Sequence, residues 1–178
     1  MDPFATLGLA RSYELDLAEL ERKYRDLQRA LHPDRHTGAP ASERRMKLQK
    51  AVEVNEAYRT LRDDQRRAEA LLAALSGTQA AAAPDERADP ELLMEMMELR
   101  EALSEAKAAG DAAEVARLAA RVTQERAAAR AELVRVFESL AGSASREALA
   151  EARALVSRLK YFQRFLDEVA VFEDEAMP

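Results

Sequence analysis

Two amphipathic segments separated by a short break dominate the first third of the chain. The first runs from Leu17 to Leu31, and the second runs from Ser42 to Arg62. Apolar side chains recur at helical spacing in both, as Leu20, Tyr24, Leu27 and Leu31, and as Ala51, Val54, Tyr58 and Leu61. The break reads LHPDRHTGAP, and Pro33 disfavours helix at the residue before it. Two antiparallel helices that face each other across a loop are therefore predicted.

Helix start signals recur along the chain, whereas strand patterns do not. Asp2 precedes a proline, which is typical of a capped helix start, and Gly8 is expected to end this brief helix. Asp16 has Glu19 three residues later, in a capping-box arrangement. After Asp63 and Asp64, a further helical segment is expected to pack back on the hairpin through Ala68, Leu71, Leu72 and Leu75. The predicted fold class is all-α.

A composition change divides the chain. Residues 77–89, GTQAAAAPDERAD, contain a glycine, a proline and an alanine run without amphipathic period, and are predicted to be a linker between domains 1–76 and 90–178. Cap and stop signals then predict a bundle of three helices with consecutive members antiparallel. Their expected spans are about Pro90 to Ala108, Asp111 to Leu140 and Ser145 to Glu173.

Composition excludes several classes of protein. Acidic residues outnumber basic ones by 33 to 27, which argues against a nucleic-acid-binding surface. The chain has no cysteine, so disulfides and thiolate metal sites are excluded. It also has no apolar run of roughly 18 residues and no signal-peptide pattern. We expect a soluble, unprocessed, cytoplasmic protein without membrane association.

Some apolar residues remain after the predicted core is assembled. In the segment after the linker, Leu92, Met96, Leu99 and Leu103 form a core stripe. Leu93, Met94 and Met97 lie on a neighbouring face, interleaved with Glu98 and Glu101, and Tyr161 and Phe165 fall outside the stripe of the last helix. Two interpretations compete: these residues widen the core, or they form a docking surface on which flexible methionines adapt to a partner.

The tripeptide His32-Pro33-Asp34 places an imidazole, a rigid ring and a carboxylate in one loop. The spacing His32-x-Asp34-x-His36 offers ligand types for a metal, but the chain has no further histidine. An acid-base pair would lack a nucleophile. The third interpretation is a solvated turn in which Asp34 bonds to backbone.

The same residues carry a resemblance to a known family. Tyr24, Leu27, His32-Pro33-Asp34, Asn55-Glu56-Ala57-Tyr58 and Leu61 together resemble the J-domain of chaperone-stimulating proteins. The stretch LLMEMMELREAL at 92–103 resembles the HscB-type co-chaperones of iron-sulfur cluster biogenesis, as do DPFATLGL, DLQRALHPDR and LRDDQRRAEALL. The resemblance covers nearly the whole chain and implies a J-domain hairpin plus a C-terminal three-helix domain.

The resemblance implies an adaptor that is not an enzyme and carries no cofactor or metal of its own. One implied partner is an HscA-type, DnaK-like chaperone ATPase, and the other is the iron-sulfur scaffold IscU. The residues that it implies for the ATPase are His32, Pro33 and Asp34, with Arg22, Arg25 and Arg29 on one basic helix face. Those that it implies for the scaffold are Leu93, Met94, Met97, Glu98, Glu101, Glu105 and Tyr161. Met97 departs from the family pattern, in which leucine is commoner.

Two other hypotheses fit parts of the sequence. A structural or regulatory helical protein would use the leftover apolar faces of the bundle for weak self-association. A metal-dependent enzyme would use His32 and His36, and it would retain stoichiometric metal after purification.

Overall fold

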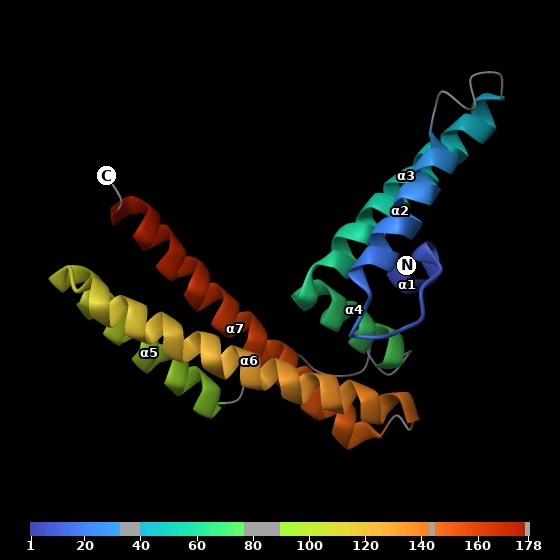
Figure 1. The fold of residues 1–178 in the computed structure, drawn as a ribbon. Coiled ribbons are helices and arrows are strands. Elements are labelled where there is room, and N and C mark those ends of the chain that lie inside the picture. Colours follow the sequence, from blue (N-terminus) through green and yellow to red (C-terminus); the bar gives the residue numbers. More distant parts are fainter. Residues whose placement is uncertain (33–39, 77–89, 143–144, 177–178) are drawn as a thin grey trace. The chain divides into compact units, whose positions relative to one another are not determined.

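The computed structural model describes residues 1–32, 40–76, 90–142 and 145–176, and the described part contains seven α-helices and no strand (Figure 1). This confirms the predicted all-α class. The chain divides into two compact units, Met1–Gly77 and Thr78–Pro178. The expected linker at 77–89 lies outside the described residues.

Unit 1 contains four helices around a central hairpin. They are α1 (Pro3–Leu7), α2 (Leu17–Leu31), α3 (Ala41–Arg62) and α4 (Asp64–Ser76). Helices α2 and α3 lie side by side and run in opposite directions, as predicted, and α1 packs against both (Figure 1).

The predicted caps determine where these helices begin and end. The Asp2 side chain accepts hydrogen bonds from the backbone N–H groups of Phe4 and Ala5, and Asp16 does the same for Ala18 and Glu19. Each bond satisfies an N–H group that the helix itself leaves without a partner. Gly8 ends α1 with φ of +63°, in the left-handed region that favours glycine.

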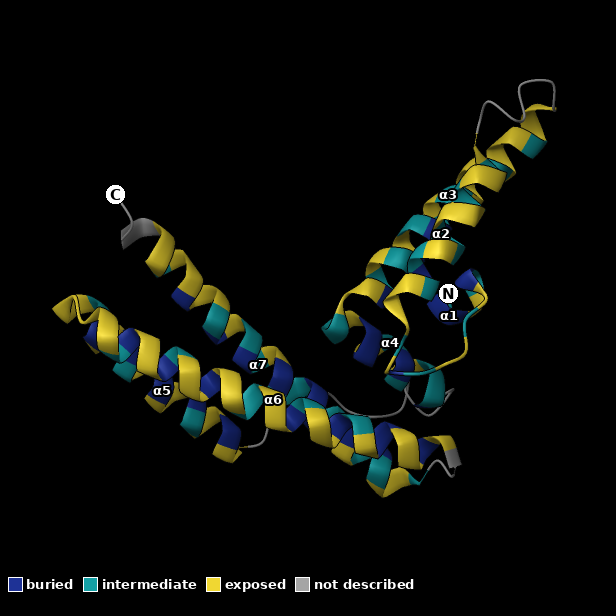
Figure 2. Ribbon diagram, viewed as in Figure 1, coloured by how far each residue is buried: buried dark blue, intermediate teal, exposed yellow. Residues whose placement is uncertain are grey.

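The core of unit 1 lies near one end of the hairpin. Fully or almost fully buried side chains come from all four helices and the α1–α2 connection: Phe4, Leu7, Tyr13, Leu20, Val54, Ala57, Leu61, Ala68 and Leu71. The rest of the predicted α2 stripe, Tyr24, Leu27 and Leu31, is only half-buried. The hairpin extends beyond α1 and α4, so its far end has only two helices to share burial (Figure 2).

A buried arginine ties α4 to the rest of unit 1. The Arg67 guanidinium donates to the carbonyls of Tyr13 and Leu61, each at 2.7 Å, and pairs with Asp64. It also lies over the Tyr13 ring, 5.3 Å from its centroid. Because a buried charge is tolerated only when its donors are satisfied, these partners explain how Arg67 can be buried.

Unit 2 contains α5 (Pro90–Ala109), α6 (Ala112–Gly142) and α7 (Arg146–Ala176), close to the predicted spans. Helices α6 and α7 form a long antiparallel pair, and the shorter α5 packs along part of it (Figure 1). Gly110, with φ of +65°, and the Asp111 cap on the N–H of Glu114 make the turn between α5 and α6.

The core of unit 2 confirms the predicted α5 stripe, since Leu92, Met96, Leu99 and Leu103 are buried. On α7, however, Phe165 is fully buried. Of the two interpretations left open for Phe165, the structure supports the wider core. The apolar band of α7 is wider than one stripe because this helix packs on both α5 and α6.

None of the helices in the described ranges combines the length and the apolar character needed to cross a lipid bilayer.

Candidate docking surfaces

The first candidate surface is the exposed basic face of α2. Arg22, Arg25 and Arg29 follow i, i+3, i+7 spacing and are all exposed. Each forms an ion pair within its own helix: Arg22 with Glu19 at 3.8 Å, Arg25 with Glu21 at 2.8 Å and Arg29 with Asp26 at 3.7 Å. Exposed pairs of this kind are weak, so the guanidiniums can exchange one carboxylate for another at small cost.

The loop predicted to carry the key tripeptide follows this face. His32 is the exposed C-cap residue of α2, with ψ of 131°, which is the extended conformation expected before a proline. Pro33 and Asp34 lie outside the described residues, as does His36 of the considered metal spacing. Within the described part of the chain, no three metal-ligating side chains come together.

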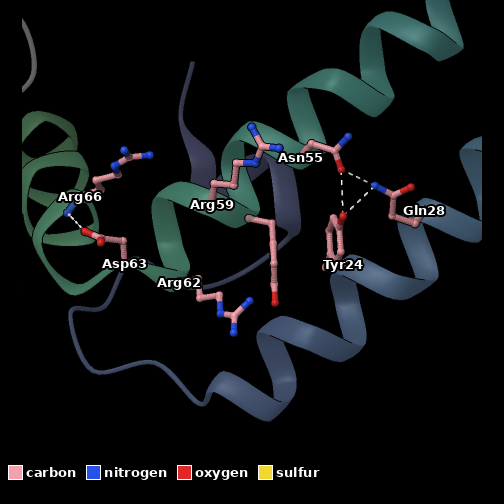
Figure 3. A pocket seen from close by; sticks show the side chains of 8 residues that line it. Tyr24, Gln28, Asn55, Arg59, Arg62, Asp63 and Arg66 are labelled. Carbon is pink, nitrogen blue, oxygen red and sulfur yellow. Dashed lines mark hydrogen bonds between the residues drawn. The ribbon is translucent and has the colours of Figure 1, made fainter. Parts of the chain in front are cut away.

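A polar cluster fills the space between α2 and α3 next to the basic face (Figure 3). The rings of Tyr24 and Tyr58 stack with centroids 4.0 Å apart. The Tyr24 hydroxyl donates to the Asn55 side-chain oxygen at 2.9 Å, and the Tyr58 hydroxyl donates to Glu21. This second bond lowers the pKa of Glu21 and raises the pKa of Tyr58.

Sequence reasoning assigned the two tyrosines to an apolar stripe and missed the cluster. The residue that could have revealed the cluster is Asn55. It follows the buried Val54, and from this position it reaches Tyr24 and Gln28 across the hairpin. Its hydrogen bonds add polar contacts of defined geometry to the apolar packing between α2 and α3.

The second candidate surface is the outward face of α5. Leu93, Met94 and Met97 are 38, 63 and 71% exposed, so they do not widen the core. Successive helical residues turn by about 100°, so Met97 lies on the side opposite Leu99. Leu93 lies on the face next to the core stripe, as predicted, and the more exposed Met94 and Met97 lie further round the helix.

Three carboxylates lie beside the apolar patch. Glu98, Glu101 and Glu105 are all exposed and follow i, i+3, i+7 spacing along α5. We call this combined surface the α5 face: Leu93, Met94, Met97, Glu98, Glu101 and Glu105. An exposed apolar patch bordered by charges is typical of a protein-binding site, and its charge favours a basic partner.

Tyr161 lies apart from these residues on α7 and is half-buried. Along α7 it falls between two links to α5: Arg158 bonds to Glu95 at 3.2 Å, and Glu168 pairs with Arg100 at 3.8 Å. Tyr161 therefore lies on the stretch of α7 that is tied to α5. Within the described residues, no hydrogen bond joins Tyr161 to the α5 face.

A charged cluster links all three helices of unit 2. Glu95 of α5 pairs with Arg121 of α6 at 3.5 Å and with Arg158 of α7 at 3.2 Å, and Arg121 also pairs with Glu125 at 2.9 Å. Burial and the neighbouring Glu125 carboxylate raise the pKa of Glu95. The sequence pattern did not predict this cluster, which joins α5 to both other helices of unit 2.

Each of the two units matches the model of a known protein family. The DnaJ domain model matches residues 2–70, and the model described as the HSCB C-terminal oligomerisation domain matches residues 88–170. A "Co-chaperone protein HscB homolog" of Aromatoleum aromaticum is 37% identical over 94% of this chain and 91% of its own length.

Vibrio cholerae provides both a sequence relative and a structure. Its relative of the same description is 38% identical over 99% of each chain. The solved structure described as "Chaperone HscB from Vibrio cholerae" has a TM-score of 0.79 at 35% identity, and the match covers 99% of this chain and 100% of that one.

Proposed function

Because this chain belongs to the HscB family of co-chaperones, we propose that it is an adaptor between a chaperone ATPase and an iron-sulfur scaffold. In this proposal, unit 1 stimulates ATP hydrolysis by an HscA-type member of the DnaK-like chaperones. Unit 2 binds an IscU-type scaffold. The chain itself is a co-chaperone and not an enzyme, and we propose that it acts in the cytoplasm.

The proposal for unit 1 is supported by its match to the DnaJ domain model and by the basic face of α2. His32 ends α2 in an exposed position, three residues after Arg29. We propose that His32, Pro33 and Asp34 dock on the ATPase, with Arg22, Arg25 and Arg29 contributing electrostatic attraction. A docked Asp34 carboxylate would couple binding of this protein to ATP hydrolysis by the chaperone and would take part in no chemical step.

The observation that carries the proposal for unit 2 is the α5 face. Leu93, Met94 and Met97 are exposed on a helix whose opposite side forms the core, so they are available to a partner without unfolding. Apolar side chains at the centre of an interface supply most of its binding free energy, and the surrounding carboxylates select a basic partner. Tyr161 is proposed to extend this site on α7.

Two surfaces on one chain define the mechanism. When the α5 face holds the scaffold and unit 1 engages the ATPase, the scaffold is at high effective concentration near the substrate site of the chaperone. ATP hydrolysis by the chaperone would then change its conformation and favour cluster transfer from the scaffold to an acceptor.

The test is steady-state ATP hydrolysis by an HscA-type chaperone, with this protein and IscU added separately and together. The expected result is strong joint stimulation that is lost in an Asp34→Asn variant. No stimulation by the intact protein would overturn the proposal.

A second candidate function is self-association through the bundle. The exposed α5 face favours self-association, as does the match of residues 88–170 to a family described as an oligomerisation domain. Sedimentation velocity with and without IscU separates the two functions: a concentration-dependent dimer that ignores IscU would favour self-association.

A further inference from the structure

Unit 1 has an open groove of about 760 Å³ between α2, α3 and the start of α4. Tyr24, Gln28 and Asn55 line one end, and Arg66 lines the other (Figure 3). Arg59 lies on α3 between these ends, together with Arg62. None of the residues that line the groove belongs to the tripeptide, and the sequence pattern did not predict it.

The arginines of this groove differ from those of α2 in their electrostatic environment. Within the described part of the chain, no carboxylate forms an ion pair with Arg59 or Arg66, whereas each of the three α2 arginines has one. The nearby Asp63 uses its carboxylate to cap α4, accepting the backbone N–H of Arg66 at 2.8 Å. Arg62 lies over the Tyr58 ring, 5.9 Å from its centroid.

The shape and the lining of the groove indicate which class of ligand it can bind. Guanidinium groups bind carboxylates through charge-assisted hydrogen bonds, and two of them here have no competing internal partner. The stacked rings of Tyr24 and Tyr58 add a flat surface on which a side chain can lie. An open groove between two helices suits a length of polypeptide better than a small molecule. The net charge of −6 disfavours nucleic acid, for which the whole chain would be repulsive.

We infer that this groove binds an acidic segment of the ATPase partner, as a second contact beside the α2 face. The inference rests on the proposed function, because it assigns the groove to the same chaperone. In this arrangement the tripeptide and α2 couple docking to ATP hydrolysis. Arg59 and Arg66 speed the association of the two proteins, because they attract the acidic segment over the range of a Debye length, about 8 to 10 Å.

The experiment is a titration of this protein into the chaperone at several salt concentrations, with ATP hydrolysis as the readout. The test variant is Arg59→Glu with Arg66→Glu. Arg135→Glu with Arg164→Glu is the matched control, because it makes the same change of net charge at exposed arginines of unit 2. Circular dichroism checks that both variants remain folded.

The expected result is a rise of about tenfold or more in the concentration that gives half-maximal stimulation, with a weaker salt dependence and an unchanged maximum. The control variant should behave like the intact protein. If the test variant also behaves like the intact protein, or if both variants weaken equally, the groove is not a contact while the proposed function stands. If the intact protein gives no stimulation, the proposed function fails and this inference fails with it.

Discussion

Replacing Leu93 and Met97 together by alanine should abolish scaffold binding while leaving unit 2 folded. The reason is the position of these side chains on α5. Met97 is 71% exposed, so little of its apolar surface contributes to the folded bundle, whereas Leu93 is 38% exposed and is partly covered. Truncating an exposed residue such as Met97 typically changes the free energy of unfolding by about 0.5 kcal/mol, and the covered part of Leu93 adds on the order of 1 kcal/mol. Alanine is a better helix former than either residue, which offsets part of this loss.

The effect on binding should be much larger. Each apolar anchor at the centre of an interface contributes on the order of 2 kcal/mol, and the contributions of two neighbours do not simply add. A combined loss of about 2 to 4 kcal/mol corresponds to an affinity weaker by roughly 30-fold to 1000-fold. The stimulation of the ATPase by this protein alone should be unchanged.

The assay is isothermal titration calorimetry with IscU, combined with urea denaturation of the same samples. The matched control is Leu99→Ala with Leu103→Ala, on the same helix but in the core, where each substitution should cost about 2 to 5 kcal/mol of stability. The reasoning would be refuted if the Leu93 and Met97 variant unfolded like this control, or if it bound IscU with unchanged affinity.

Three further predictions address other parts of the molecule. Asp34→Asn should abolish ATPase stimulation with unchanged IscU affinity, as measured by calorimetry, and loss of both activities would contradict separate surfaces. Arg67→Met should destabilise unit 1 by about 3 to 5 kcal/mol in urea denaturation, because it leaves two buried carbonyls and Asp64 without their partner; a change below about 1 kcal/mol would show that the arginine is dispensable. Finally, because the pKa of Glu95 is raised, the folded state holds this proton to higher pH than the unfolded state does. The contribution of Glu95 to stability is therefore present at pH below its ordinary pKa of 4.5 and is lost as pH rises through the raised pKa. Glu95→Gln should remove this pH dependence in denaturation series from pH 4 upward, and an unchanged slope would exclude Glu95 as its source.

Periodicity and capping signals predicted the helices well because both are local. Asp2, Asp16 and Asp111 cap the helices that follow them, and Gly8 and Gly110, which both have positive φ, lie where helices end. The α5 core stripe and its leftover residues could be separated for the same reason. The docking roles of those leftover residues stay predictions.

The features that the sequence left open or did not predict all depend on contacts between helices. Phe165 is buried because α7 packs on two helices, a fact that the spacing within α7 does not contain. The Glu95 cluster brings together residues of α5, α6 and α7 that are 26 to 63 positions apart. The groove arises only when α2 and α3 are placed side by side with the start of α4.

The internal ion pairs of α2 have a consequence for how long a partner stays bound. A partner carboxylate that engages Arg22, Arg25 or Arg29 displaces Glu19, Glu21 or Asp26, so one ion pair replaces another and the net gain is small. Such an exchange contributes little to residence time, because the displaced carboxylate remains three or four residues away and can return. Binding and release of a partner at this face therefore involve similarly small changes in free energy. Under the proposed function, easy release would let a single molecule of this protein serve many rounds of ATP hydrolysis by the chaperone.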